Sequence, residues 1–270
     1  MINFKKKFPG AYNPKKLTRE VKVGNIIIGG DNPVVIQEMC STLTKDISST
    51  ISQLRYFKEL GVKLARVAIP DEESARAIRV LKNEVSINLV ADIQFNHRYA
   101  IIAIESGVDK IRLNPGNISS RSALLDIVSL AKERTVPIRI GVNSGSLEKN
   151  ILLKYGALKP EAMVESALKQ VLILEKLGFY DIIVSLKSPD VLLTIKVNRL
   201  MSQKVDYPLH IGITEAGIGD ESSLISAIGM GILLLEGIGD TIRVSLSYRD
   251  RARNIIAGRK ILESLSIQYI

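Results

Sequence analysis

The feature that most constrains the fold of this chain is a repeated alternation of short apolar segments with amphipathic ones. Eight apolar segments follow one another from Pro33 onward: PVVIQEM, VKLARVAIP, INLVADIQF, VDKIRLNPGN, PIRIGVNSG, YDIIVSLKSPD, LHIGITEAG and DTIRVSLS. Each precedes a segment of helical periodicity, and the predicted helices span residues 47–60, 71–82, 96–106, 119–134, 160–177, 189–203, 221–235 and 249–265. Short apolar strands that alternate with amphipathic helices are typical of a parallel sheet covered on both faces.

Eight such units in a chain of 270 residues predict a (β/α)8 TIM barrel, which is an α/β fold. An open, doubly wound sheet has similar local patterns, but no glycine-rich dinucleotide-binding sequence follows the first strand and no P-loop occurs. Residues 21–30, VKVGNIIIGG, predict a short hairpin that turns at Gly24-Asn25. We expect a basic tail over residues 1–20, a barrel domain over 21–267, and a longer loop before the helix at 160–177.

The cysteine content and the apolar runs indicate a cytoplasmic protein. Cys40 is the only cysteine, which excludes an internal disulfide and fits a reducing compartment. One thiolate is also too few to hold an iron–sulfur cluster. No apolar run reaches the roughly 18 residues that a membrane span needs, and the N-terminus lacks the apolar stretch of a secretory signal.

The net charge of +9 raises the question of a nucleic-acid partner. Aromatic residues make up only 5% of the chain, however, and no basic helix alternates with aromatic residues on which bases could stack. Much of the excess charge lies in Lys5–Lys7 and Lys15–Lys16, where we expect a solvated tail. The charge alone therefore does not indicate nucleic-acid binding.

Polar side chains alternate with apolar ones where these apolar segments end. In KIRLNPGN, residues 110–117, Arg112 and Asn114 are two residues apart and so point to the same face of a strand. A guanidinium fork beside an amide is suited to binding an anion. The plain alternative is a strand end whose polar side chains reach water. Recurrence of the pattern in other strands favours the anion site.

In a TIM barrel the active site lies at the carboxyl ends of the strands. There the chain carries Arg66, Asp92, Gln94, Arg112, Asn114, Arg139, Asn143, Lys187, Glu215, Arg243 and Ser245. Charged side chains are costly to bury without partners, so we expect this set to share one cavity. It has five cations and two carboxylates, and the surplus of three positive charges predicts a phosphate or diphosphate ligand. Ser245 follows the last strand, near the place where barrels often bind phosphate.

The two histidines and the cysteine are weaker candidates for chemistry. His97 begins a predicted helix, where a position facing the barrel mouth and a cap on the turn are both open, and we expect the cap. His210 opens the seventh strand at the opposite end of the barrel, where we expect packing. Histidines so placed predict no zinc site, and we assign no metal ligand. Cys40 follows the first strand without a basic partner nearby, so we expect a small, half-buried residue rather than a nucleophile.

Several long motifs, in the same order along the chain, resemble a known family. They are TREVKVGN, VADI, KIRLNPGN, IRIGVNSGSLEKN, LHIGITEAG and SAIGMGILLLEGIGDTIRVSL. Over about Thr18 to Ile267, the chain resembles the barrel domain of 4-hydroxy-3-methylbut-2-enyl diphosphate (HMBPP) synthase. The resemblance implies an oxidoreductase of isoprenoid biosynthesis by the methylerythritol phosphate route. It would open and dehydroxylate 2-C-methyl-D-erythritol 2,4-cyclodiphosphate with two electrons, delivered by flavodoxin or ferredoxin through a 4Fe-4S cluster.

The resemblance also implies roles for individual residues. The diphosphate-binding positions of the family match Arg66, Arg112, Arg139, Lys187, Arg243 and Ser245, and the positions around the carbon skeleton match Asn114, Asn143, Asp92 and Glu215. As catalytic candidates we take Glu215, which would handle protons near the departing hydroxyl, Asp92, which would orient a neighbouring donor, and Asn143. Gln94 stands where the family usually has a histidine, and its amide cannot titrate near neutral pH.

The resemblance covers the barrel domain of the family but not the domain that holds its iron–sulfur cluster. In the family, three cysteines and a glutamate of a further domain hold the iron, whereas this sequence stops at Ile270. We therefore expect a truncated, substrate-binding half that binds no cluster itself, and that pairs as a homodimer or with a separate chain that carries the cluster domain. Two alternatives stay open: a pterin-binding barrel like that of dihydropteroate synthase, which needs no cluster, and a non-catalytic remnant that binds diphosphate.

Overall fold

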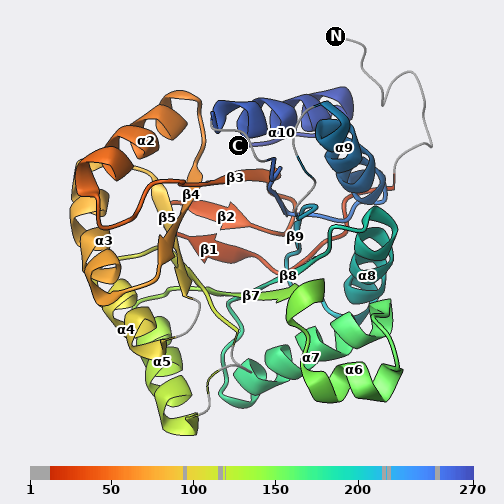
Figure 1. Ribbon diagram of the computed structural model, residues 1–270, viewed down its shortest axis with the longest axis horizontal. Coiled ribbons are helices and arrows are strands. Elements are labelled where there is room, and N and C mark those ends of the chain that lie inside the picture. The colour runs from red at the N-terminus through yellow and green to blue at the C-terminus, as the bar shows by residue number, and fades with distance from the viewer. Residues whose placement is uncertain are drawn as a thin grey trace.

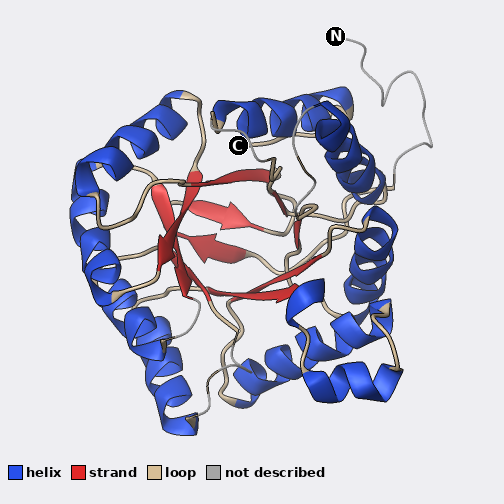
Figure 2. Ribbon diagram, in the orientation of Figure 1, coloured by secondary structure: helices blue, strands red, loops and turns tan. Residues whose placement is uncertain are grey.

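The computed structural model describes residues 13–93, 96–114, 118, 120–214, 217, 220–246 and 250–270. In this part of the chain, parallel strands form one sheet in the order β8-β7-β6-β5-β4-β3-β10-β9. The strands are β3 (Val35–Met39), β4 (Leu64–Ile69), β5 (Asn88–Ile93), β6 (Lys110–Arg112), β7 (Ile138–Asn143), β8 (Ile182–Lys187), β9 (His210–Ile211) and β10 (Thr241–Ile242). A parallel bridge between Val184 and Leu209 joins β8 to the start of β9, so the sheet curls into a ring (Figures 1 and 2).

Helices surround this ring, as the alternation of the sequence predicts (Figure 2). They are α2 (Ile47–Glu59), α3 (Glu72–Glu84), α4 (His97–Glu105), α5 (Arg121–Glu133), α6 (Lys149–Tyr155), α7 (Pro160–Lys176), α8 (Val191–Lys204), α9 (Asp220–Leu235) and α10 (Ala252–Ser264). The predicted TIM barrel is confirmed. No helix in the described ranges is both long and apolar enough to cross a membrane.

Two local predictions were wrong. Where we expected only a loop before residue 160, the chain forms a short 3-10 turn, Ser144–Ser146, and then helix α6. His97 does not cap helix α4, because the side chain of Asn96 accepts the hydrogen bond from the backbone nitrogen of Arg98 at 3.0 Å. A short polar side chain that precedes the first helical residue is the usual acceptor at this position.

Alternation along each strand separates an apolar outer face from a polar inner face. In β7, the side chains of Ile138, Ile140 and Val142 belong to the core between the sheet and the helices. The intervening residues, Arg139, Gly141 and Asn143, point to the inside of the ring because side chains alternate between faces. The outer face therefore supplies the hydrophobic burial, and the inner face is left for polar groups.

The predicted hairpin is confirmed and closes one end of the barrel. Strands β1 (Val21–Val23) and β2 (Ile26–Ile28) pair antiparallel, with Gly24 at φ +57° in the turn. Figure 1 shows the hairpin inside the ring of strands. Its apolar side chains form a second core cluster with Val35, Leu64, Val90 and Ile183, which lie in the first halves of their strands. This packing fills the amino-terminal end, so the polar inner face is directed toward the other end.

Part of the segment predicted to be a solvated tail lies against the barrel instead. The ammonium of Lys15 is 3.2 Å from a carboxylate oxygen of Asp240, which is almost fully buried. The ammonium of Lys16 donates to the backbone oxygen of Val205 at 3.0 Å. Residues 5–7, which carry the other lysines of that prediction, lie outside the described residues.

Candidate functional site

The strand register brings the predicted polar residues opposite one another inside the barrel. Asp92 of β5 is paired with Arg112 of β6, and Arg112 with Arg139 of β7. At the next level of the sheet, Asn143 of β7 is paired with Lys187 of β8. Residues paired in register point to the same face of a sheet, so all of these side chains are directed into the interior.

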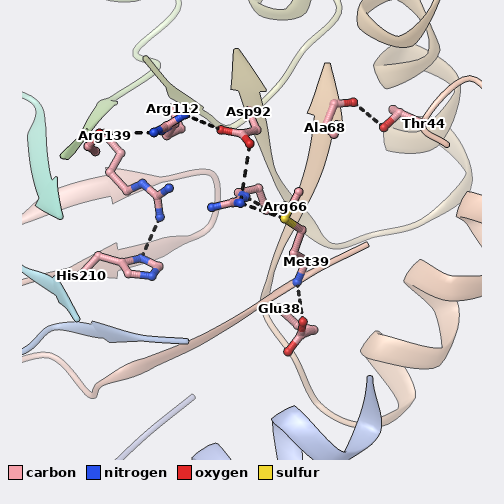
Figure 3. Close-up of polar contacts among 10 residues, drawn as sticks. Glu38, Met39, Thr44, Arg66, Ala68, Asp92, Arg112, Arg139 and His210 are labelled. Carbon is pink, nitrogen blue, oxygen red and sulfur yellow. Dashed lines mark hydrogen bonds and ion pairs between the residues drawn. The ribbon is translucent and has the colours of Figure 1, made fainter. Parts of the chain in front are cut away.

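Asp92 lies between two guanidiniums, as Figure 3 shows. One of its carboxylate oxygens is 3.6 Å from Nη2 of Arg66, and the other is 3.3 Å from Nη1 of Arg112. The aspartate side chain is 3% exposed, whereas the two arginine side chains are 14% and 15% exposed. The carboxylate thus forms the buried side of this group, and the guanidiniums keep a path to solvent.

The backbone of Gly141 holds the two residues that the KIRLN pattern singles out. Nη2 of Arg112 donates to the carbonyl oxygen of Gly141 at 3.2 Å, and the amide of Gly141 donates to Oδ1 of Asn114 at 3.0 Å. Both backbone groups of one residue therefore orient neighbouring side chains of the adjacent strand. The predicted pairing of a guanidinium and an amide on one face is present, with β7 as its support.

Arg66 and Arg139 lie deeper than predicted. We expected them at the carboxyl ends of their strands, but Arg66 is the third residue of β4 and Arg139 is the second residue of β7. Strands of a barrel are staggered along the axis, so a residue early in one strand lies level with a residue late in the next. Arg139, which is paired with Arg112 in register, is only 3% exposed, so it forms the buried floor of the site rather than part of the rim.

His210 belongs to the same floor, which corrects its predicted role as a packing residue at the far end. Its side chain is fully buried, and Nδ1 is 3.2 Å from Nη1 of Arg139 (Figure 3). Burial, and then the charges of Lys187 and Arg139, lower the pKa of the imidazole well below its usual value. The same effects of burial and of neighbouring guanidiniums, Arg139 first, lower the pKa of the Lys187 ammonium.

The remaining predicted residues occupy different surroundings. Arg243 follows β10 and is partly buried, and burial followed by the charge of Arg66 lowers its pKa to about 10. Asn143 and Ser245 are also partly buried. Glu215 and Gln94 lie outside the described residues. Among the described members of the predicted set, five cations therefore face one carboxylate, Asp92.

Two buried charged residues beside the predicted set, Lys110 and Glu38, were missed by the sequence analysis. Lys110, the first residue of β6, is fully buried, and its Nζ has no hydrogen-bond partner in the described part of the chain. The sequence did contain a signal for Lys110. It lies two residues before Arg112 in KIRLN, so it points to the same face of the strand as Arg112 and Asn114. Glu38 in β3 is 1% exposed, and burial raises the pKa of its carboxyl while the charge of Arg243 opposes that rise.

The residue types of this chain do not fit an iron–sulfur cluster. The described ranges contain no group of three or more histidine, cysteine, aspartate or glutamate side chains arranged to hold a metal. Cys40 is the only cysteine of the sequence, and burial raises the pKa of its thiol to about 12. A cluster takes thiolates as ligands, and a buried thiol is a poor source of one.

Solved structures of low sequence identity share the fold. 3-Dehydroquinate dehydratase from Geobacillus kaustophilus superposes with a TM-score of 0.63 at 15% identity, covering 93% of this chain and 99% of that one. Dihydropteroate synthase from Xanthomonas albilineans superposes with a TM-score of 0.61 at 11% identity, covering 92% of this chain and 97% of that one. At these identities the likeness concerns the barrel alone, so it does not support the pterin-binding alternative.

Several proteins are far more similar to this chain in sequence than these solved structures are. Proteins named 4-hydroxy-3-methylbut-2-en-1-yl diphosphate synthase (flavodoxin) are 55% identical in Caldanaerobacter subterraneus subsp. tengcongensis, over 94% of this chain, and 52% identical in Clostridium perfringens, over 93%. The relative of that name in Thermotoga maritima is 49% identical over 93% of this chain. The chain spans 71% of the length of each of these relatives. The family model described as GcpE TIM-barrel domain matches residues 18–258. The chain therefore belongs to the GcpE family, whose TIM-barrel domain it carries.

Proposed function

We propose that this barrel binds 2-C-methyl-D-erythritol 2,4-cyclodiphosphate and acts as the substrate-binding part of an HMBPP synthase of isoprenoid biosynthesis. The observation that carries the proposal is the group of basic side chains at Asp92, where Arg66 and Arg112 contact the carboxylate and Arg139 is paired with Arg112 in register. Relatives at about half identity carry the name of that enzyme. A diphosphate supplies several negative charges to a site that has a surplus of positive ones.

The cations have different parts in this proposal. Arg66 and Arg112 keep a path to solvent and would meet the diphosphate oxygens with paired N–H donors. Arg139 would contribute its charge from the floor of the site. Burial, and then the charges of these guanidiniums, lower the pKa of the Lys187 and Arg243 side chains. An incoming anion would offset that repulsion, so diphosphate binding would favour the charged form of Lys187. The hydroxyl of Ser245 would add a donor.

The polar residues would orient the groups of the site rather than neutralise its positive charge. Asp92 contacts two guanidiniums, at 3.6 and 3.3 Å, which agrees with an orienting role and leaves a net positive charge. Asn114 is fixed by the amide of Gly141, and Asn143 lies beside Lys187 in the register. We assign to Glu215 the handling of protons near the departing hydroxyl, following the resemblance of the LHIGITEAG segment.

The reduction itself needs groups beyond the residues of this barrel. The proposed reaction consumes two electrons, and the single buried thiol of Cys40 cannot supply the ligands of a 4Fe-4S cluster. We infer that the cluster ligands come from residues outside this barrel, with flavodoxin or ferredoxin as the electron donor. The residues of this barrel would bind and orient the substrate and would exclude water from the diphosphate.

The test is calorimetric titration of the purified chain with methylerythritol cyclodiphosphate, with a pterin diphosphate as the comparison ligand. Saturable binding of the cyclodiphosphate, and weaker binding of the pterin, is the expected result. Preference for the pterin diphosphate would overturn the assignment in favour of a dihydropteroate synthase-like barrel. Binding of neither ligand would contradict the proposal and favour a remnant that has lost its site.

A further inference from the structure

The contact between His210 and Arg139 determines which nitrogen of the imidazole carries the proton. Nη1 of Arg139 lies 3.2 Å from Nδ1 of His210. A guanidinium has five N–H donors and no acceptor, so the imidazole nitrogen that faces it must accept. Nδ1 is therefore unprotonated, the proton is on Nε2, and the ring is neutral.

The surroundings of His210 keep it neutral. Its side chain is fully buried, and the charged groups that face it from the other strands are Lys187 on β8, Arg139 on β7, Lys110 on β6 and Arg66 on β4. On the neighbouring strand β10, Thr241 is paired with it in register and is uncharged. All four are basic groups, and the carboxylate of Asp92 is paired with Arg66 at 3.6 Å rather than with the ring. Protonation would add a further positive charge among these groups.

The orientation of Arg139 depends on its contact with His210 more than the orientations of Arg66 and Arg112 depend on their own contacts. Arg66 and Arg112 are each held by a carboxylate oxygen of Asp92. Within the described ranges, Arg139 makes no ion pair, its Nε has no partner, and its hydrogen bond is the one to His210. The neutral imidazole is thus the group that fixes the direction of this guanidinium.

We propose that His210 is a positioning residue that holds Arg139 for the diphosphate without cancelling its charge. The proposal rests on the proposed function, because it takes Arg139 as part of the diphosphate site. A carboxylate in the same place would also accept from the guanidinium, but it would remove one positive charge from the site. A neutral histidine orients the arginine and leaves the full charge for the ligand.

Three substitutions of His210 separate the effect of its hydrogen-bond acceptor from the effects of ring shape and of added negative charge. In His210→Asn, the amide oxygen can accept near the place of Nδ1, so we expect affinity for the cyclodiphosphate within about threefold of wild type. His210→Phe keeps a ring but removes the acceptor, and we expect a loss of about tenfold or more, the scale of one charge-assisted hydrogen bond. His210→Asp keeps an acceptor and adds a negative charge, and we expect a loss comparable to that of His210→Phe. Thermal unfolding of each variant checks that it folds.

A spectroscopic measurement tests the contact without any ligand. The chain has two histidines, so nitrogen NMR of the imidazoles can be assigned by comparison with His97→Gln. We expect His210 to remain neutral and protonated at Nε2 from pH 5 to pH 8, because its ordinary pKa of about 6.5 is strongly lowered. A proton on Nδ1, or titration near pH 6.5, would overturn the proposal.

The two tests distinguish failure of this inference from failure of the proposed function. If the wild-type chain binds no cyclodiphosphate, the proposed function fails, and so does the role of His210 in diphosphate binding, while the NMR result still establishes or removes its contact with Arg139. If the wild-type chain binds and His210→Phe binds equally well, the function stands and the positioning role fails. Equal losses in His210→Asn and His210→Phe would show that the imidazole shape matters and not its acceptor, which also contradicts the proposal.

Discussion

The guanidinium of Arg112 lies directly across the backbone of Gly141. Its Nη2 donates to the carbonyl oxygen of that glycine at 3.2 Å, and a Cβ placed on Gly141 would lie 2.8 Å from its Nε. An ordinary side chain would therefore displace the arginine, because real Cβ atoms do not approach so closely. The absence of a side chain at position 141 is part of what places Arg112 in the candidate site.

Replacing Gly141 by alanine should weaken ligand binding more than it affects folding. The added methyl group pushes the guanidinium away from Asp92 and from the backbone carbonyl, so we expect affinity for the cyclodiphosphate to fall by about 1–2 kcal/mol. Calorimetric titration measures the loss. Gly231→Ala is the matched control, since a Cβ there meets nothing within 4 Å and the residue lies in helix α9. Equal affinity of Gly141→Ala and wild type would contradict the prediction.

Replacing Arg112 by alanine removes donors from the centre of the site. We expect the affinity for diphosphate ligands to fall by about 1.5–3 kcal/mol, the range for hydrogen bonds to charged groups. The comparison variant is Arg55→Ala, because the Arg55 side chain is 56% exposed and pairs with Glu84 on the helical surface at 3.2 Å. Titration at two ionic strengths should show a weaker salt dependence in Arg112→Ala alone. An unchanged affinity would remove Arg112 from the site.

Replacing Asp92 by asparagine keeps the shape of the side chain but removes the charge between two arginines. Loss of one partner from a buried ion pair costs about 3–5 kcal/mol of stability, so we expect a drop of that order in urea unfolding. Added pyrophosphate should restore part of the loss, because it supplies the missing negative charge. Asp206→Asn serves as the control, since its pair with Arg19 is exposed and should contribute about 1 kcal/mol or less. Stability equal to that of wild type would show that Asp92 does not neutralise these arginines.

Replacing Lys110 by methionine should stabilise the barrel. The ammonium is fully buried without a partner in the described residues, and burial, then the charges of Arg139 and Arg66, lower its pKa well below the usual value. An apolar side chain of similar length avoids this cost, so we expect a gain of about 1–4 kcal/mol at pH 7. Lys169→Met, on the surface of helix α7, should change stability by about 1 kcal/mol or less.

The pH dependence of Lys110→Met gives a second readout. A lowered pKa in the folded state means that the unfolded chain binds more protons, so this lysine costs stability below about pH 10.4 and ceases to do so above it. The advantage of the methionine variant should therefore shrink as the pH rises from 7 toward 10. A difference that stays constant over this range would show that Lys110 is charged in the folded protein.

Helix α6 illustrates what the sequence pattern does not reveal. Its residues Lys149–Tyr155 form only about two turns, and the preceding Glu148 makes no capping hydrogen bond from its side chain. Short helices depend on tertiary packing, here through buried Ile151, more than on local signals. The long helices were predicted within a few residues, because three or four turns give a clear periodicity and several begin at a capping aspartate such as Asp71.

The sequence by itself determined the barrel, the hairpin and the face of each strand to which the polar residues point. Alternation along a strand is a local property, so the inward direction of Arg112 and Asn114 can be read from KIRLN alone. Only the tertiary structure decided which inward residues meet. Arg139 and His210 are 71 positions apart, and their contact depends on the stagger between strands and on a closed ring that no local pattern encodes. The sequence therefore specified the face to which residues such as Arg112 and Asn114 point, and the closing of the barrel determined the depth and the partners of the inward charges.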